Sequence, residues 1–122
     1  MNTVELILPL SPSINSYYGA RKGGGKYIKP EGVAFREEVD WMVRAKKLKT
    51  MLGRLWVVAY IHARNKVVID IDNRLKSLLD ALQHAKVFEN DSQIDDLHAK
   101  RGVIVPGGRI VVMIGEIDVV KE

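Results

Sequence analysis

The chain has 122 residues, of which 47% are hydrophobic and 28% are charged, and its formal net charge is +4. This size and balance indicate one soluble globular domain covering residues 1–122 and exclude an intrinsically disordered chain. The absence of cysteine excludes a disulfide scaffold and a zinc ribbon, and no apolar run approaches the roughly 20 residues of a membrane-spanning helix. Because the N-terminal MNTVELILPL also lacks the basic segment and cleavage site of a signal peptide, we expect a cytoplasmic protein without membrane contact.

The first half of the chain predicts two strands and a helix. Residues 4–8 form a short apolar run closed by Pro9, and the following loop, 11–19, is rich in turn residues. A helix is expected over 30–49, because it begins at a proline, has an apolar face and ends in lysines. Residues 55–63 are rich in β-branched and aromatic side chains and predict a well-buried strand.

The second half predicts a helix and two strands. Over 73–86, four leucines recur at the spacing of one helix face. Residues 94–105 and 109–117 are expected to form a β-hairpin around the turn at 106–108, which reads Pro-Gly-Gly. The order β-α-β-α-β-β predicts a single α+β domain, with a mixed sheet and helices packed on it.

The charges are distributed unevenly along the chain. Residues 70–96 contain seven acids against three bases, whereas the remainder contains sixteen bases against eight acids. A basic body with one acidic segment suits an enzyme that holds a polyanion and concentrates metal ions at one place. The alternative is an uneven solvated surface without a function.

Two aspartates stand one residue apart in VVIDIDNRLKSLLD, at 67–80. If this segment is extended, the carboxylates of Asp70 and Asp72 point to the same side, with Asp72 at the N-cap of the following helix. Lys76 and Asp80 then follow at intervals of four residues on one helix face. Two neighbouring carboxylates repel each other unless a cation lies between them, and oxygen ligands without cysteine or a nearby histidine favour Mg²⁺ or Mn²⁺ over zinc.

The acidic turn FENDSQIDD, at 88–96, adds a further candidate ligand, Asp91. We expect Asp91 to join Asp70 and Asp72 in one metal site if the sheet brings this loop beside them. The alternative is that Asp72 only caps a helix, Asp70 is only solvated and Lys76 is only a helix partner of Asp72. Carboxylates from separate segments favour the metal site over these roles.

Several motifs, in order, resemble the RusA family of Holliday junction resolvases: LPLSPSINSYY from Leu8, DIDNRLKSLLDAL from Asp70 and ENDSQI from Glu89. The resemblance covers nearly the whole chain. It implies a cytoplasmic, structure-selective endodeoxyribonuclease that requires Mg²⁺ and is commonly carried on prophages. Such an enzyme resolves four-way DNA junctions as a homodimer by paired symmetric nicks, in recombination and repair, and leaves 5′-phosphate and 3′-hydroxyl ends.

By matching position, the resemblance assigns metal binding to Asp70, Asp72 and Asp91, and catalysis to these acids together with Lys76. Metal ions held there would supply the attacking water and neutralise charge on the transition state. Lys76 would contact the scissile phosphate or stabilise developing charge. The chain departs from the family where a basic cluster usually precedes the first aspartate, because three apolar residues separate Lys66 from Asp70.

The basic segment GARKGGGKY, at 19–27, lacks the G-x-x-x-x-G-K-[ST] spacing of a nucleotide-binding loop, so we expect no nucleotide cofactor. Such a loop either contacts DNA phosphates or is inert surface. We expect DNA contacts from Asn15, Tyr17, Arg21, Lys22, Lys26, Lys29, Arg64, Lys66 and Asn73. Tyr17 and Tyr18 are candidates for stacking on unpaired bases, with ordinary packing as the alternative for at least one of them.

Two other functions fit the sequence. One is a DNA-binding module without catalysis, in which the acids serve as caps and solvated charge. A carboxylate cluster facing DNA would repel phosphate, which disfavours this reading. The other is a nuclease for flap or other branched DNA, which competition between a flap and a four-way junction would distinguish.

Overall fold

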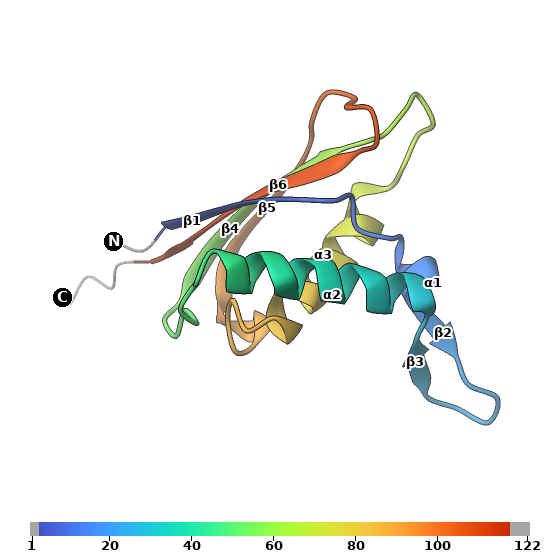
Figure 1. The fold of residues 1–122 in the computed structure, drawn as a ribbon, viewed down its shortest axis with the longest axis horizontal. Helices are drawn as coiled ribbons and strands as arrows, with labels where there is room; N and C mark the ends of the chain where they lie inside the picture. Colours follow the sequence, from blue (N-terminus) through green and yellow to red (C-terminus); the bar gives the residue numbers. More distant parts are fainter. Residues whose placement is uncertain (1–2, 118–122) are drawn as a thin grey trace.

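A mixed four-stranded sheet carries two long helices on one of its faces (Figure 1). The computed structural model describes residues 3–117, and the strands of this sheet are β1 (Thr3–Leu8), β4 (Leu55–His62), β5 (Ile94–Arg101) and β6 (Arg109–Glu116). The long helices are α2 (Pro30–Ala45) and α3 (Ile71–His84). The short elements are α1 (Ile14–Tyr17), β2 (Tyr18–Ala20), β3 (Lys26–Ile28) and the 3₁₀ helix η1 (Asp91–Gln93). The predicted class, a single α+β domain with a mixed sheet, is confirmed.

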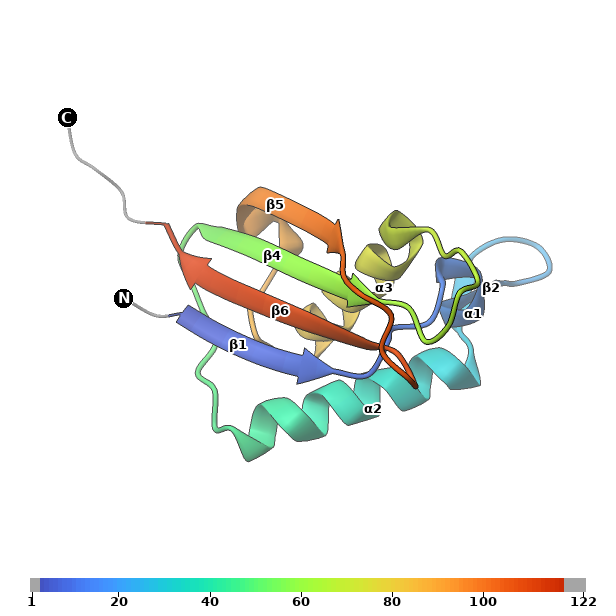
Figure 2. The ribbon, with the colours of Figure 1, turned by 90° about the horizontal axis from the view of Figure 1, so that it is seen from above.

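The sheet has the strand order β1-β6-β4-β5, in which β6 is antiparallel to both neighbours and β5 is parallel to β4. Figure 2 shows α2 along the β1 side of the sheet and α3 behind β4 and β5. Because α3 connects two parallel strands, its N-terminus follows the end of β4 and its C-terminus precedes the start of β5. The two ends of α3 therefore lie at opposite ends of the sheet.

The predicted hairpin between the last two strands is wrong. β5 and β6 lie on opposite sides of β4 and do not pair with each other. The connection between them is bound to the end of β4, where the N–H groups of Gly102 and Val105 donate to the carbonyls of Ile61 (2.9 Å) and Ala63 (3.0 Å). These bonds hold the β5–β6 connection against the end of β4. After the Pro-Gly-Gly turn, β6 pairs with β4 on the side opposite to β5.

Both long helices end earlier than predicted, because a lysine in the left-handed backbone region follows each of them. α2 ends four residues before position 49, and Lys47 has φ 53°. α3 ends two residues before Lys86, which has φ 64°, and the next N–H, of Val87, donates to the carbonyl of Leu82 at 3.0 Å. Glycine usually occupies this position after a helix. Because lysine stands there in both cases, no glycine signal in the sequence marked the two helix ends.

The loop predicted at 11–19 contains the short helix α1, and the basic, glycine-rich segment after it forms the tip of a two-stranded hairpin, β2–β3. Gly23, Gly24 and Gly25 all have positive φ, a conformation that other residues rarely adopt. The hairpin projects from the end of the molecule that carries α1 (Figure 1). Sequence patterns missed its strands because each has only three residues.

The hydrophobic core lies between the sheet and the two long helices. Alternate residues of β4, from Leu55 to Ile61, are fully buried against side chains of α2 and α3, which include Phe35, Val39, Val43, Leu78 and Leu82. Burial of this kind fixes α3 on the sheet and so determines where both of its ends lie. Within residues 3–117, no helix is long and apolar enough to span a membrane.

Candidate active site

The two aspartates of the D-x-D motif lie at the N-terminus of α3, and both are exposed. Asp70 is the N-cap residue, with φ −80° and ψ 119°, and Asp72 lies in the first turn. The prediction that Asp72 caps the helix is wrong, because α3 begins at Ile71 and Asp70 is its N-cap residue. In the described part of the chain, neither carboxylate has a hydrogen-bond or salt-bridge partner. The positive end of the helix dipole favours the ionised form of both carboxylates, and neither charge is neutralised by a partner within the described residues.

Lys76 follows Asp72 by one helical turn, and its side chain is exposed. The i,i+4 spacing predicted for this pair is confirmed. Asn73, a predicted DNA contact, lies beside them and is half-buried. The N-terminal half of α3 thus presents carboxylates and an ammonium group to solvent on neighbouring faces.

Asp91 lies at the other end of α3. It is the exposed first residue of η1, and its N–H donates to Oε1 of Gln83, in the last turn of α3, at 2.9 Å. The helix between Ile71 and Gln83 is ~18 Å long at 1.5 Å per residue. The predicted return of this loop to Asp70 and Asp72 is therefore wrong for a single chain, because α3 joins opposite ends of the β4–β5 pair. Within residues 3–117, no three Asp, Glu or His side chains are placed to hold one metal ion.

The turn that carries Asp91 is held by the polar side chains around it. Asn90 accepts a hydrogen bond from the N–H of Ser92 at 2.9 Å, and Gln93 Oε1 accepts one from the N–H of Asn90 at 3.0 Å. The Gln93 amide also donates to two carbonyls in the segment before β4, both at 2.9 Å. This capping box fixes the backbone at Asp91 and leaves its carboxylate exposed. The N-x-x-Q spacing of Asn90 and Gln93 in the sequence could have indicated this capping box.

Asp80, in the middle of α3, is bound by side chains of two other helices. Its Oδ2 accepts from Arg36 Nη2 at 2.7 Å and from the Tyr17 hydroxyl, whose oxygen accepts from Arg36 Nε at 2.6 Å. Burial alone would raise the pKa of Asp80, but the hydrogen bonds from Tyr17 and Arg36 outweigh it and lower that pKa below the usual value. Burial, and then the bond to Asp80, raise the pKa of Tyr17. This triad, Tyr17–Arg36–Asp80, joins α1, α2 and α3.

The triad also decides which tyrosine can reach DNA. Tyr17 is 0% exposed, so it is not available for the base stacking and DNA contact predicted for it. Tyr18 is half-buried, with its ring edge-on to that of Tyr17 at 4.7 Å between centroids. The ammonium of Lys26 lies 5.4 Å from the centre of the Tyr18 ring. Of the two tyrosines, only Tyr18 keeps an accessible ring.

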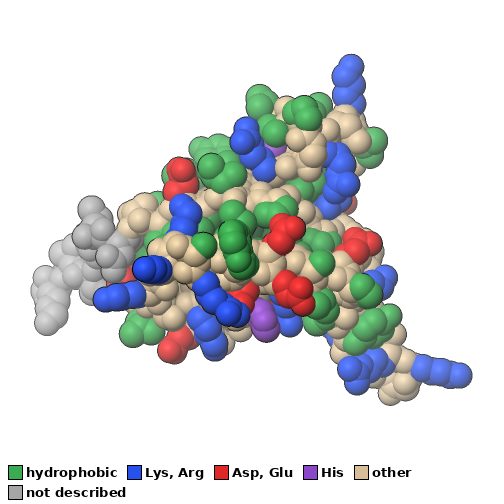
Figure 3. Space-filling model, in the orientation of Figure 1, with side chains coloured by type: hydrophobic (Ala, Val, Ile, Leu, Met, Phe, Trp, Pro, Cys, Tyr) green, Lys and Arg blue, Asp and Glu red, His purple; other side chains and the backbone are tan. Residues whose placement is uncertain are grey.

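The predicted DNA-contacting residues of the N-terminal third are gathered around the β2–β3 hairpin. Arg21, Lys22 and Lys26 are exposed on the hairpin, and Lys29 Nζ donates to the carbonyl of Asn15 at its base, at 2.8 Å. Figure 3 shows Lys and Arg side chains at the tip of this hairpin and on the loops that rise beyond the sheet. The hairpin is therefore a positively charged extension of the domain.

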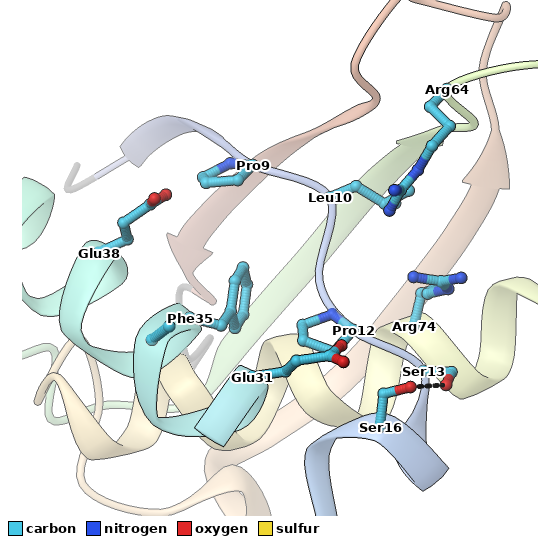
Figure 4. Close-up of a pocket in the computed structure, with 11 residues that line it drawn as sticks. Pro9, Leu10, Pro12, Ser13, Ser16, Glu31, Phe35, Glu38, Arg64 and Arg74 are labelled. Carbon is cyan, nitrogen blue, oxygen red and sulfur yellow. Dashed lines mark hydrogen bonds between the residues drawn. The ribbon is translucent and has the colours of Figure 1, made fainter. Parts of the chain in front are cut away.

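The other predicted basic contacts, Arg64 and Lys66, are exposed in the loop between β4 and α3. Arg64 borders a hollow of about 460 Å³ between α2, the segment after β1 and α3 (Figure 4). Arg74, which the sequence did not single out, also lines it, and its Nη1 donates to the carbonyl of Ser11 at 2.7 Å. Arg74 follows Asp70 by four residues, so it is a charged neighbour of the candidate metal ligands.

Comparison with known proteins shows which family this chain is similar to. Residues 9–115 match the family model of endodeoxyribonuclease RusA. The chain is 39% identical to the crossover junction endodeoxyribonuclease of Enterobacteria phage HK97, over 97% of this chain and 98% of that protein. It is 31% identical to the enzyme of that name from Enterobacteria phage 82 and 30% identical to the one from Escherichia coli strain K12, each over 95% of this chain and 97% of the relative.

The chain therefore belongs to the RusA endodeoxyribonuclease family, as its motifs predicted. The match covers both ends of α3 and the β2–β3 hairpin, so the acidic segment and the basic extension lie within the shared domain.

Proposed function

We propose that this protein is a Mg²⁺-dependent endonuclease that resolves Holliday junctions by paired symmetric nicks, in DNA recombination and repair. The names of its relatives, which are crossover junction endodeoxyribonucleases, support this substrate. The observation that carries the proposal is that the aspartates of the matched motifs, Asp70, Asp72 and Asp91, are exposed and unpaired within residues 3–117. An acidic segment with no internal partner is suited to a metal ion.

The donor set fits a hard divalent cation. Asp70 and Asp72 offer carboxylate oxygens at one end of α3, in a chain without cysteine. Mg²⁺ prefers such oxygen ligands and binds through one or two carboxylates, keeping several waters, and Mn²⁺ accepts the same set. Bound there, the metal would supply a water for attack and neutralise charge on the phosphate.

We further propose that the missing acid comes from a second copy of the chain. A Holliday junction needs two symmetric cuts, which a two-fold dimer with two active sites would make. A two-fold axis across the middle of α3 exchanges the ends of this helix between subunits. Asp70 and Asp72 of one subunit would then lie beside Asp91 of the partner subunit, although they are about 18 Å apart along one helix. The site would be complete only in the dimer.

The remaining chemistry falls to Lys76 and the basic surface. Lys76, one turn from Asp72, would donate to an oxygen of the scissile phosphate and stabilise the charge that develops there. The basic hairpin and the loop after β4 would hold the backbone of the junction arms. Cleavage would leave 5′-phosphate and 3′-hydroxyl ends.

The proposal is tested by incubating the purified protein with an end-labelled four-way junction, with and without Mg²⁺. We expect paired nicks at symmetric positions only when Mg²⁺ is present. Preferential cutting of a flap that competes with the junction would identify a nuclease for other branched DNA. Tight junction binding without any cutting in Mg²⁺ or Mn²⁺ would identify a DNA-binding module and contradict the proposal.

A further inference from the structure

Arg64 and Arg74 line a second, smaller hollow of about 170 Å³ beside the N-terminus of α3. The rest of its lining is uncharged and consists of Leu10, Ala63, Asn65, Val67 and Ile69. It adjoins the larger hollow of Figure 4 through the two arginines and Leu10. The acids of that larger hollow, Glu31 and Glu38, come from α2, whereas the arginines come from the β4–α3 loop and α3. The charged side chains that line the smaller hollow are therefore both basic.

Arg74 is held in place before any ligand arrives. Its Nη1 donates to the carbonyl of Ser11, and the hydroxyl of Ser11 donates to the carbonyl of Arg74, both at 2.7 Å. Burial lowers the pKa of Arg74, the charge of Arg64 lowers it further, and only Glu31 acts in the opposite direction. Arginine nevertheless stays protonated in proteins, so two positive charges face each other here.

No salt bridge within residues 3–117 includes Arg64 or Arg74. An anion between them would relieve their repulsion, and a guanidinium group matches the paired oxygens of a phosphate better than any other side chain. The hollow, at about 170 Å³, is several times larger than the roughly 30 Å³ occupied by one water, so it has room for a phosphate group.

We propose that Arg64 and Arg74 together hold one backbone phosphate of the DNA strand, next to the phosphate that is cut. Arg74 follows Asp70 by four residues, about 6 Å along the helix axis, so the held phosphate belongs to the strand that enters the acidic site. This inference rests on the proposed function, because it assumes that the strand reaches Asp70. It assigns the two arginines a positioning role and adds Arg74 to the DNA-contacting surface.

The test measures the affinity of the protein for a four-way junction in Ca²⁺, as a function of salt, for Arg64→Gln and Arg74→Gln. Glutamine removes the charge in both variants, and in Arg74→Gln it keeps a side-chain N–H that can donate towards the Ser11 carbonyl. We expect each variant to bind about tenfold more weakly and to reduce the salt slope by about one, because one phosphate contact is lost. The double variant should lose less than the product of the single losses, because both arginines hold the same phosphate.

Arg101→Gln is the matched control, because Arg101 is an exposed arginine at the end of β5 and lines neither hollow. It should change the affinity less than twofold, and thermal unfolding should show that all variants remain folded. Unchanged affinity in both variants, an equal loss in Arg101→Gln, or fully multiplicative losses would each overturn the shared phosphate site. Because binding is measured without cutting, these outcomes are independent of whether the wild-type protein cleaves in Mg²⁺.

Discussion

The acidic segment contains two kinds of aspartate, which differ in whether the fold uses their charge. Asp80 is bound by Arg36 and Tyr17, and Asp95 is bound by Arg54, whose Nε donates to it at 3.0 Å. The acids at the two ends of α3 have no such partners within residues 3–117. A paired carboxylate is already neutralised, whereas an unpaired one attracts a cation from solution.

The difference follows from where each residue lies. The middle of α3 packs beside α2, which supplies Arg36 to Asp80. Asp72, in the first turn of α3, and Asp91, in η1 after its C-terminus, are exposed and have no ion-pair partner within residues 3–117. Position along the chain therefore separates the paired acids from the unpaired ones, although the sequence presents them as one cluster.

The largest expected effect is the loss of cleavage when an unpaired acid is neutralised. Asp70→Asn, Asp72→Asn and Asp91→Asn should each reduce the nicking rate in Mg²⁺ about a thousandfold, because the metal loses an anionic ligand. Junction affinity in Ca²⁺ should hold or increase, because repulsion of phosphate falls. The thermal midpoint should stay at the wild-type value. A variant of Asp70 that cuts at a near wild-type rate would show that the unpaired acids are not functional.

A smaller loss is expected for the ammonium group beside these acids. Lys76→Ala should reduce nicking about a hundredfold by removing stabilisation of charge on the phosphate. Lys76→Arg, measured in parallel, should recover part of the rate because the positive charge is kept. The side chain of Lys76 is exposed, so circular dichroism and thermal unfolding should match those of the wild type. Loss of folding in Lys76→Ala would contradict this account of its position.

Neutralising the paired Asp80 should affect stability. Asp80→Asn should lower the free energy of unfolding by about 2 kcal/mol at pH 7, because it leaves Arg36 half-buried without its counter-charge. The pKa of Asp80 is lower in the folded state, so this stabilisation is present above the unfolded value of about 3.9 and is lost as pH falls through the folded pKa. Urea unfolding at a series of pH values should show the difference from wild type shrinking in acid. A difference independent of pH would exclude the ion pair as its cause.

The smallest effect is expected at the exposed pair. Asp95→Asn should leave nicking within about twofold of wild type, because Arg54 and Asp95 lie in solvent and such pairs contribute little. The variant is therefore the natural control for the other aspartate substitutions, and its rate is measured on the same junction. A collapse of cleavage in Asp95→Asn would remove the distinction between paired and unpaired acids.

Much of the fold could be predicted from local patterns. The helix carrying Leu75, Leu78, Leu79 and Leu82 and the buried strand at 55–63 were recognisable because periodic burial leaves a periodic sequence. The pairing of β5 and β6 with β4 was not, because strand order depends on contacts distant in the chain. Helix limits shifted by a few residues where lysines took a backbone conformation usually reserved for glycine.

The site could be predicted only in part, for a related reason. The sequence presents the motif acids as one group, and it does not show which of them are paired with cationic side chains in the fold. The partners of Asp80 lie 44 and 63 residues earlier in the chain, so no local spacing indicated them. The separation of Asp91 from Asp70 likewise depends on α3 crossing the length of the sheet.

The central claim is that unpaired acids from opposite ends of α3 meet across a dimer. It is tested most directly with mixed dimers, in which one subunit carries Asp70→Asn and the other Asp91→Asn, each with a different affinity tag. Both homodimers should be inactive, whereas the mixed dimer has one intact site, made by Asp70 and Asp72 of one subunit and Asp91 of the partner subunit. We predict that it nicks a junction strand in Mg²⁺ at about half the wild-type rate per dimer, without symmetric resolution. A mixed dimer as inactive as both homodimers would contradict the shared site.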